Sequence, residues 1–179
     1  MKSSTYRLAL LALLAGAALP IHAQTVTQGK VNFTGQLIAD TCAVKSGDED
    51  KDIVLPTVST QSLDSAGKTA GSTPFQITVE NCPATIEEVA AHFEMTNMEP
   101  TRFTLKNLAT ATAAENVSVQ LIEADGTPIP LGSRGASYAV TGTGAGRGAV
   151  MTYGAQYYAL DATLPGRVET FTQFTLAYP

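Results

Sequence analysis

The sequence is poor in the residues that bind metals or catalyse reactions. Its 179 residues include only two cysteines and two histidines, and its acidic residues outnumber its basic ones by sixteen to eleven. No basic patch or interleaved aromatic stripe is present, which argues against nucleic acid as a partner. Beyond the N-terminal region, no apolar run is long enough to cross a bilayer as a helix. Nucleic-acid binding and membrane-spanning functions are therefore disfavoured.

The first 23 residues have the three-part pattern of a secretory signal. Lys2 and Arg7 form a basic start, an apolar run of twelve residues extends from Leu8 to Leu19, and Ala23 is a small residue at the expected cut. Such a run is too short to span a membrane. We expect residues 1–23 to be removed on export. The mature chain, 24–179, then has nine basic and sixteen acidic residues.

The two cysteines, Cys42 and Cys82, both lie in the expected mature chain. In an exported protein such a pair predicts a disulfide. The alternative, a metal site, is disfavoured because two thiols with His92, the single mature histidine, make a poor ligand set. We expect a Cys42–Cys82 disulfide and no metal or other cofactor.

Short alternating segments separated by turn residues run along the mature chain, which is typical of a β-sandwich. One helical turn is expected within residues 59–68, ending at Gly67. Residues 89–95 have a composition that favours helix, but their place between strands leads us to interpret them as a strand. The other expected strands are residues 31–37, 53–55, 75–82, 117–121, 129–131, 149–160 and 168–178, with a turn at Asp125-Gly126.

No combination of residues in the sequence supports catalysis. The acidic run Gly47–Asp52 lacks the glycine and glutamate of a calcium loop, and we interpret it as a solvated loop. The glycine-rich run 142–148 fits neither phosphate-binding pattern. His92 has no acidic partner in sequence and is interpreted as a half-buried strand residue. We therefore expect that the chain is not an enzyme.

Both ends of the mature chain look like strands. At the N-terminal end, Thr27, Gly29, Val31 and Phe33 share one face, and this arm precedes the first cysteine. The arm either folds back to close its own sandwich or reaches out to complete the sheet of a neighbour. At the other end, Val168, Thr170, Thr172, Phe174, Leu176 and Tyr178 fall at every second position, and only Pro179 follows them.

The ordered set of these segments resembles one protein family. It comprises "GKVNFTGQLIADTC", "VLPTVSTQSL", "STPFQITVENC", "NVSVQLIEADGTPIPLG", "YGAQYYA" and "GRVETFTQFTLAYP". Together they resemble the pilins of the chaperone–usher pathway, the type 1 fimbrial major subunit family, over the whole mature chain. That family typically has a glycine fourteenth from the end and a penultimate tyrosine, and Gly166 and Tyr178 occupy these positions. The terminal Tyr-Pro is a small departure.

The resemblance implies an all-β fold, an incomplete immunoglobulin-like β-sandwich that lacks its final strand and is completed by donor-strand addition. Residues 24–35 would be the donor arm, with Thr27, Gly29, Val31 and Phe33 inserted and Gly29 as a checkpoint. Residues 36–179 would be the pilin domain. Its groove and terminal strand would include Gly166, Val168, Phe174, Leu176 and Tyr178.

The same resemblance implies a structural subunit of an adhesive fimbria on the bacterial surface, exported through the periplasm. Its expected partners are a periplasmic chaperone, an outer-membrane usher and neighbouring copies in a homopolymer. A minor adaptor or terminating subunit is the alternative. A tip adhesin would need an additional lectin domain, for which 156 mature residues leave no room. A secreted β-sandwich enzyme or inhibitor is the remaining class.

Overall fold

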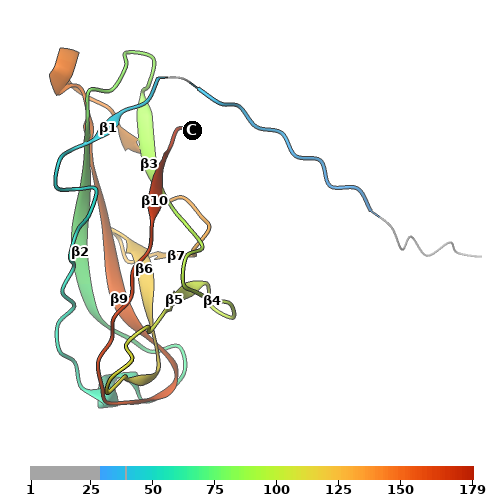
Figure 1. The fold of residues 1–179 in the computed structure, drawn as a ribbon, viewed down its shortest axis with the longest axis vertical. Helices are drawn as coiled ribbons and strands as arrows, with labels where there is room; N and C mark the ends of the chain where they lie inside the picture. The colour runs from blue at the N-terminus through green and yellow to red at the C-terminus, as the bar shows by residue number, and fades with distance from the viewer. Residues whose placement is uncertain (1–28, 39) are drawn as a thin grey trace, which may run out of the picture. The chain divides into compact units, whose positions relative to one another are not determined.

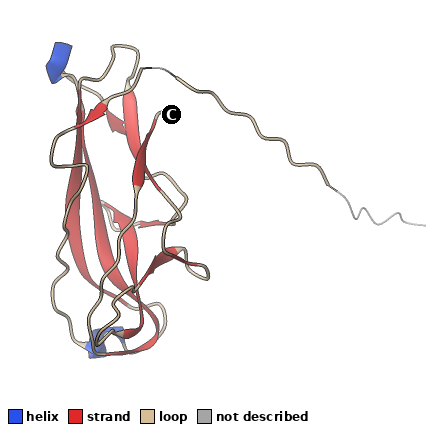
Figure 2. Cartoon of the chain, viewed as in Figure 1, coloured by secondary structure: helices blue, strands red, loops and turns tan. Residues whose placement is uncertain are grey.

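The structure, a computed structural model, describes residues 29–38 and 40–179, and its compact part extends from Ile38 to Pro179. Strands dominate it, with a short 3-10 turn at each end of the long strands (Figure 2). The elements are β1 (Ala43–Val44), η1 (Thr60–Leu63), β2 (Thr69–Glu80), β3 (Glu88–Phe93), β4 (Met98–Glu99), β5 (Thr104–Lys106), β6 (Glu115–Glu123), β7 (Pro128–Ile129), β8 (Tyr138–Ala139), η2 (Gly144–Gly146), β9 (Ala149–Leu164) and β10 (Phe174–Ala177).

The strands form two sheets that face each other. The larger sheet has the order β1-β2-β9-β6-β5-β4, and β7 pairs with β6; the smaller has the order β10-β3-β8. All strand pairs within these sheets are antiparallel. Figure 1 shows β10, the last strand, beside β3 and facing the long strands β2, β9 and β6. The fold is an immunoglobulin-like β-sandwich.

The centre of the sandwich is an aromatic cluster around Tyr153 of β9, which is fully buried. Its ring packs edge-on against Phe93 of β3, with ring centroids 5.2 Å apart, so the cluster joins the two sheets. The Tyr153 hydroxyl accepts a hydrogen bond from the Ala91 N–H and donates one to the Ala136 carbonyl, each 3.0 Å long. Burial raises the pKa of Tyr153 to about 12, so this hydroxyl keeps its proton and both bonds at physiological pH.

Several expectations from the sequence are confirmed. Residues 89–93 of the ambiguous segment 89–95 lie in strand β3, the Asp125-Gly126 turn joins β6 to β7, and η1 supplies the expected helical turn. Gly67 follows that turn with φ of +88°, a conformation that favours glycine. The cysteines Cys42 and Cys82 form the predicted disulfide, and both are buried.

Two strand predictions are wrong in full, and several others extend too far, such as 129–131, of which only Ile129 lies in a strand. Residues 31–37 and 53–55 belong to no strand, and of the terminal strand predicted over 168–178 only Phe174–Ala177 is paired in a sheet. A strand needs a backbone partner as well as alternating side chains. Residues 31–37 and 168–173 alternate, and residues 53–55 form a short apolar run, but within the described residues none of them joins a strand ladder.

Candidate strand-acceptor groove

A groove of about 1120 Å³ runs along the sandwich between two segments far apart in sequence. One wall is the terminal segment 168–176, and the other is formed by Val44 and residues 48–55. Its floor is made by side chains of both sheets, which are largely buried or half-buried core residues. The floor residues are Phe75, Ile77, Phe93, Leu105, Val119, Leu121, Ala155 and Tyr157. The groove therefore lies directly over the hydrophobic core.

The side chains of the terminal wall alternate as the sequence predicted, but they are not fully covered. Every second residue from Val168 to Tyr178 is half-buried, and none of these six is buried. Val168, Phe174 and Leu176 line the groove and pack against the core. One further strand in the groove would cover them more completely.

The backbone of this wall is paired on one side only. The carbonyls of Glu169, Phe171 and Gln173 accept hydrogen bonds from Leu108 N at 2.7 Å, from the Asn97 side-chain amide at 3.3 Å and from Glu94 N at 2.9 Å. Backbone groups of successive residues in an extended chain point to opposite sides. The intervening residues 168, 170 and 172 make no backbone hydrogen bond to any described residue. The groove side of the wall is therefore an open strand edge.

The opposite wall is a second open edge. Residues 49–58 make no backbone hydrogen bond to another described residue. The start of this wall is fixed by Asp48, whose carboxylate accepts a 2.7 Å bond from Thr78 N and pairs with Lys51 at 2.6 Å. The hydrogen bond from Lys51 is the main cause that lowers the pKa of Asp48 to about 2. The acidic run is thus partly anchored, whereas the sequence predicted only a solvated loop.

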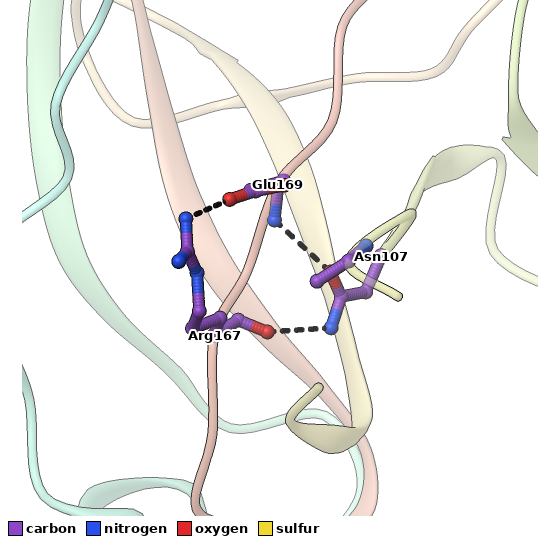
Figure 3. A network of polar contacts seen from close by, with 4 residues as sticks. Asn107, Arg167 and Glu169 are labelled. Atoms are coloured by element: carbon purple, nitrogen blue, oxygen red, sulfur yellow. Dashed lines mark hydrogen bonds and ion pairs between the residues drawn. The ribbon is translucent and has the colours of Figure 1, made fainter. Parts of the chain in front are cut away.

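Both ends of the terminal segment are held firmly. At its start, the Asn107 side chain donates to the Arg167 carbonyl at 2.9 Å and accepts from Glu169 N at 3.0 Å, and Arg167 also forms an ion pair with Glu169 (Figure 3). At its end, the Tyr178 hydroxyl accepts a 2.9 Å bond from Cys42 N. Sequence reasoning missed Asn107, because a single asparagine in a loop carries no local signal.

Gly166 lies at the point where the terminal segment passes residues 112–114. A Cβ on Gly166 would lie 2.3 Å from Ala114 N, which is closer than any real contact. The neighbouring Arg167 bridges Ala113 and exchanges backbone bonds with Thr112 and Ala114. Gly166 and Tyr178 therefore lie outside the groove lining and fix the two ends of its wall.

The predicted donor residues lie before the compact part of the chain. Thr27 falls outside the described residues. A Cβ added to Gly29 would have no heavy atom within 4 Å. Val31 and Phe33 are 75% and 90% exposed. The same face continues beyond the predicted arm to Leu37, which is 99% exposed. Sequence reasoning noted the alternation of Leu37 but left it out of the donor set.

Other chemistry finds no support in the described residues. His92 is a half-buried residue of β3, as the sequence indicated. Among residues 29–38 and 40–179, no three His, Cys, Asp or Glu side chains are grouped to hold a metal ion. No helix in that part of the chain has the length and apolar character to cross a membrane.

A groove with a hydrophobic floor and two open backbone edges is suited to accept one β-strand. The inserted strand would form hydrogen bonds along both walls, and its alternate side chains would cover the floor. Without it, both edges and the half-buried apolar side chains that line the groove stay open to water and to other chains.

Comparison with known proteins places this fold in a family. The family model described as "Fimbrial protein" matches residues 31–179. The chain is 37% identical to the F17 fimbrial protein of Escherichia coli, over 90% of this chain and 93% of that protein. It is 34% identical to the minor fimbrial subunit HifD of Haemophilus influenzae, over 97% of this chain and 82% of that protein.

A solved structure with a similar fold comes from a chaperone–usher pilus. The similarity has a TM-score of 0.61 at 20% identity and covers 87% of this chain and 98% of the other. At that identity it supports the fold, and the sequence relatives carry the family assignment. The chain belongs to the fimbrial protein family and is a structural subunit of a pilus.

Proposed function

We propose that this subunit polymerises by donor-strand exchange, in which the N-terminal arm of one copy fills the groove of the next. The observation that carries this proposal is the pair of open edges, at residues 49–58 and at residues 168, 170 and 172, on either side of an apolar floor. A strand seated between them satisfies both edges and covers the half-buried apolar side chains that line the groove.

The occupant is the arm of residues 24–35, with Thr27, Gly29, Val31 and Phe33 directed into the groove. Val31 and Phe33 are apolar and exposed, so their transfer into the groove is favourable. Leu37 extends the same face and is added to the inserted set. The domain then corresponds to residues 36–179, and residues 1–23 act as the export signal.

The assembly route follows from the exposure of the empty groove. A periplasmic chaperone covers the groove after export, an outer-membrane usher receives the complex, and the arm of the next copy replaces the chaperone. The product is a homopolymeric fimbria at the bacterial surface that supports adhesion, and the chain has no catalytic role. Similarity to the minor subunit HifD keeps an adaptor or terminating role as the second candidate.

The proposal is tested by deleting the arm. Chaperone-bound subunit is purified as the full mature chain and as a chain lacking residues 24–35, and the formation of SDS-resistant multimers is followed. The full chain should polymerise, and the deleted chain should not. Fibres formed by the deleted chain alone would overturn strand donation. Counting this subunit against the others in isolated fimbriae separates a major from a minor role.

A second experiment supplies the missing strand in the same chain. A second copy of residues 24–37 is joined after Pro179 through a short flexible linker, and the original arm is removed. This arm-fused chain should be a soluble monomer that unfolds cooperatively, whereas the chain without either arm should aggregate or be degraded. A stable, cooperative monomer from the chain without an arm would contradict the open-groove interpretation.

A further inference from the structure

The rim of the groove carries an uneven charge. The lining residues include five acidic side chains and a single lysine, and four of the five acids lie in the acidic loop, residues 47–52, on one wall. Asp48 of this loop is paired with Lys51. Glu49, Asp50 and Asp52 are exposed and have no ion-pair partner among the described residues. The loop therefore presents a net negative charge beside the groove.

The arm carries the complementary charge. Between Gln24 and Leu37, Lys30 is the only charged residue. It lies between Gly29 and Val31, so in an extended strand its side chain points away from the face that enters the groove. A lysine at such a position can extend its long stem sideways and bring the ammonium group to a charged rim.

We propose that Lys30 of an incoming arm is recognised by the acidic loop of the acceptor copy, and that this contact steers the arm and sets its direction in the groove. The inference rests on the proposed donor-strand exchange. Residues 47–52 of the acceptor then distinguish this arm from an arm that is uncharged or acidic.

The location of the acidic loop gives the contact a direction. Asp48 of the loop accepts a hydrogen bond from Thr78 N. The next residue, Val79, pairs with Val44 of β1, two positions after Cys42, which contacts Tyr178. The acidic loop therefore lies at the Tyr178 end of the groove. With Lys30 at this end, Val31, Phe33 and Leu37 follow toward Val168. The arm then runs antiparallel to the terminal segment.

The test is a charge-swap cycle in full-length mature chains purified with their chaperone. Three variants are compared with the wild type: Lys30→Glu, the double variant Asp50→Lys with Asp52→Lys, and the triple variant that combines them. Multimer formation is followed at about 10 mM and about 1 M salt, where the Debye length is about 30 Å and about 3 Å. Lys68→Glu, an exposed change outside the groove lining, is the control for net charge.

At low salt, Lys30→Glu and the double variant should each polymerise about tenfold more slowly, and the triple variant should recover most of the wild-type rate. At high salt the differences should disappear, and Lys68→Glu should match the wild type at both. Equal rates for Lys30→Glu and wild type at low salt, or a triple variant as slow as its parents, would overturn the contact. Donor-strand exchange itself fails only if the arm-deleted chain also polymerises.

Discussion

The Tyr178 hydroxyl accepts a 2.9 Å hydrogen bond from the backbone N–H of Cys42, a residue 136 positions earlier in the chain. Cys42 is buried and forms the disulfide with Cys82. The penultimate residue therefore closes the terminal wall of the groove against the disulfide-bonded end of the opposite wall. This contact gives the penultimate tyrosine a structural role at one end of the groove.

Replacing Tyr178 by phenylalanine should destabilise the domain. The Cys42 N–H would lose its partner while it stays in a buried position, and such a loss costs about 1–3 kcal/mol. Urea unfolding of the arm-fused chain measures the change. Tyr158→Phe is the matched control, because this tyrosine is also half-buried and, among the described residues, the only side chain that forms a hydrogen bond with it is that of Ser118, which donates to its backbone carbonyl. Equal losses in the two variants would contradict the role of the Tyr178 bond.

Removal of the disulfide should have a larger effect. The chain-entropy model gives about 4 kcal/mol for a loop of this length, a large share of the stability of a single domain. The double variant Cys42→Ser with Cys82→Ser should therefore show a much lower unfolding midpoint in the arm-fused chain. Mass spectrometry of the wild-type protein should find no free thiol, and two free thiols would refute the pairing.

A methyl group at Gly166 should also be harmful. It would meet the backbone of residues 112–114 at less than 3 Å, so the terminal segment or that loop must move, at about 1–3 kcal/mol. Gly146→Ala is the control, since a Cβ at Gly146 meets nothing within 4 Å and its φ lies outside the positive range. Thermal unfolding of both arm-fused variants should separate them by several degrees.

Side chains added to the inserted face of the arm should block polymerisation and leave the acceptor domain intact. Gly29 and Gly35 both lie on that face, and a Cβ on either meets no atom in the single chain. Gly29→Leu and Gly35→Leu should each retain chaperone binding and form multimers slowly, because glycine in a strand marks a close approach. Asn32→Leu, on the opposite face, is the control. A rate equal to wild type for Gly29→Leu would remove Gly29 as a checkpoint.

The stability of the arm-fused chain should fall in acid partly through Asp48. Its folded pKa is about 2, below the value of 3.8 for a free aspartate, chiefly because of the hydrogen bond from Lys51. The carboxylate therefore contributes stability above pH 3.8, and this contribution is lost as the pH falls toward 2. Asp48→Asn should lower stability at neutral pH and flatten the decline between these values. A parallel pH profile for wild type and variant would contradict the assignment.

The sequence predicts the β-strands that have partners within the chain. Alternation and turn residues locate β2, β6 and β9, and the setting of residues 89–95 between strands correctly outweighs their helical composition. The predictions fail at residues 53–55, a short apolar run, and at residues 168–173, where the alternation is real but the backbone joins no strand ladder. Alternation indicates which side chains point inward, but it does not indicate which strand the backbone pairs with.

The site was predictable to a similar degree. Val168, Phe174 and Leu176 line the groove as the terminal alternation and the family resemblance indicated. The contacts of Asn107 with Arg167 and Glu169 could not be predicted, since they join residues about 60 positions apart. Long-range polar contacts of this kind leave no periodic pattern in a sequence.

The anchoring of the terminal wall at both ends has an entropic consequence. Fixing the backbone of one residue opposes folding by about 1–2 kcal/mol. Asn107 and Gly166 fix the start of the wall, at residues 166–169, and Tyr178 fixes it after β10, so the conformation of the segment between them is set when the domain folds. On binding to this wall, an arriving strand then loses only its own conformational entropy. The terminal wall is therefore preorganised, and ordering it does not reduce the affinity of the groove for the strand.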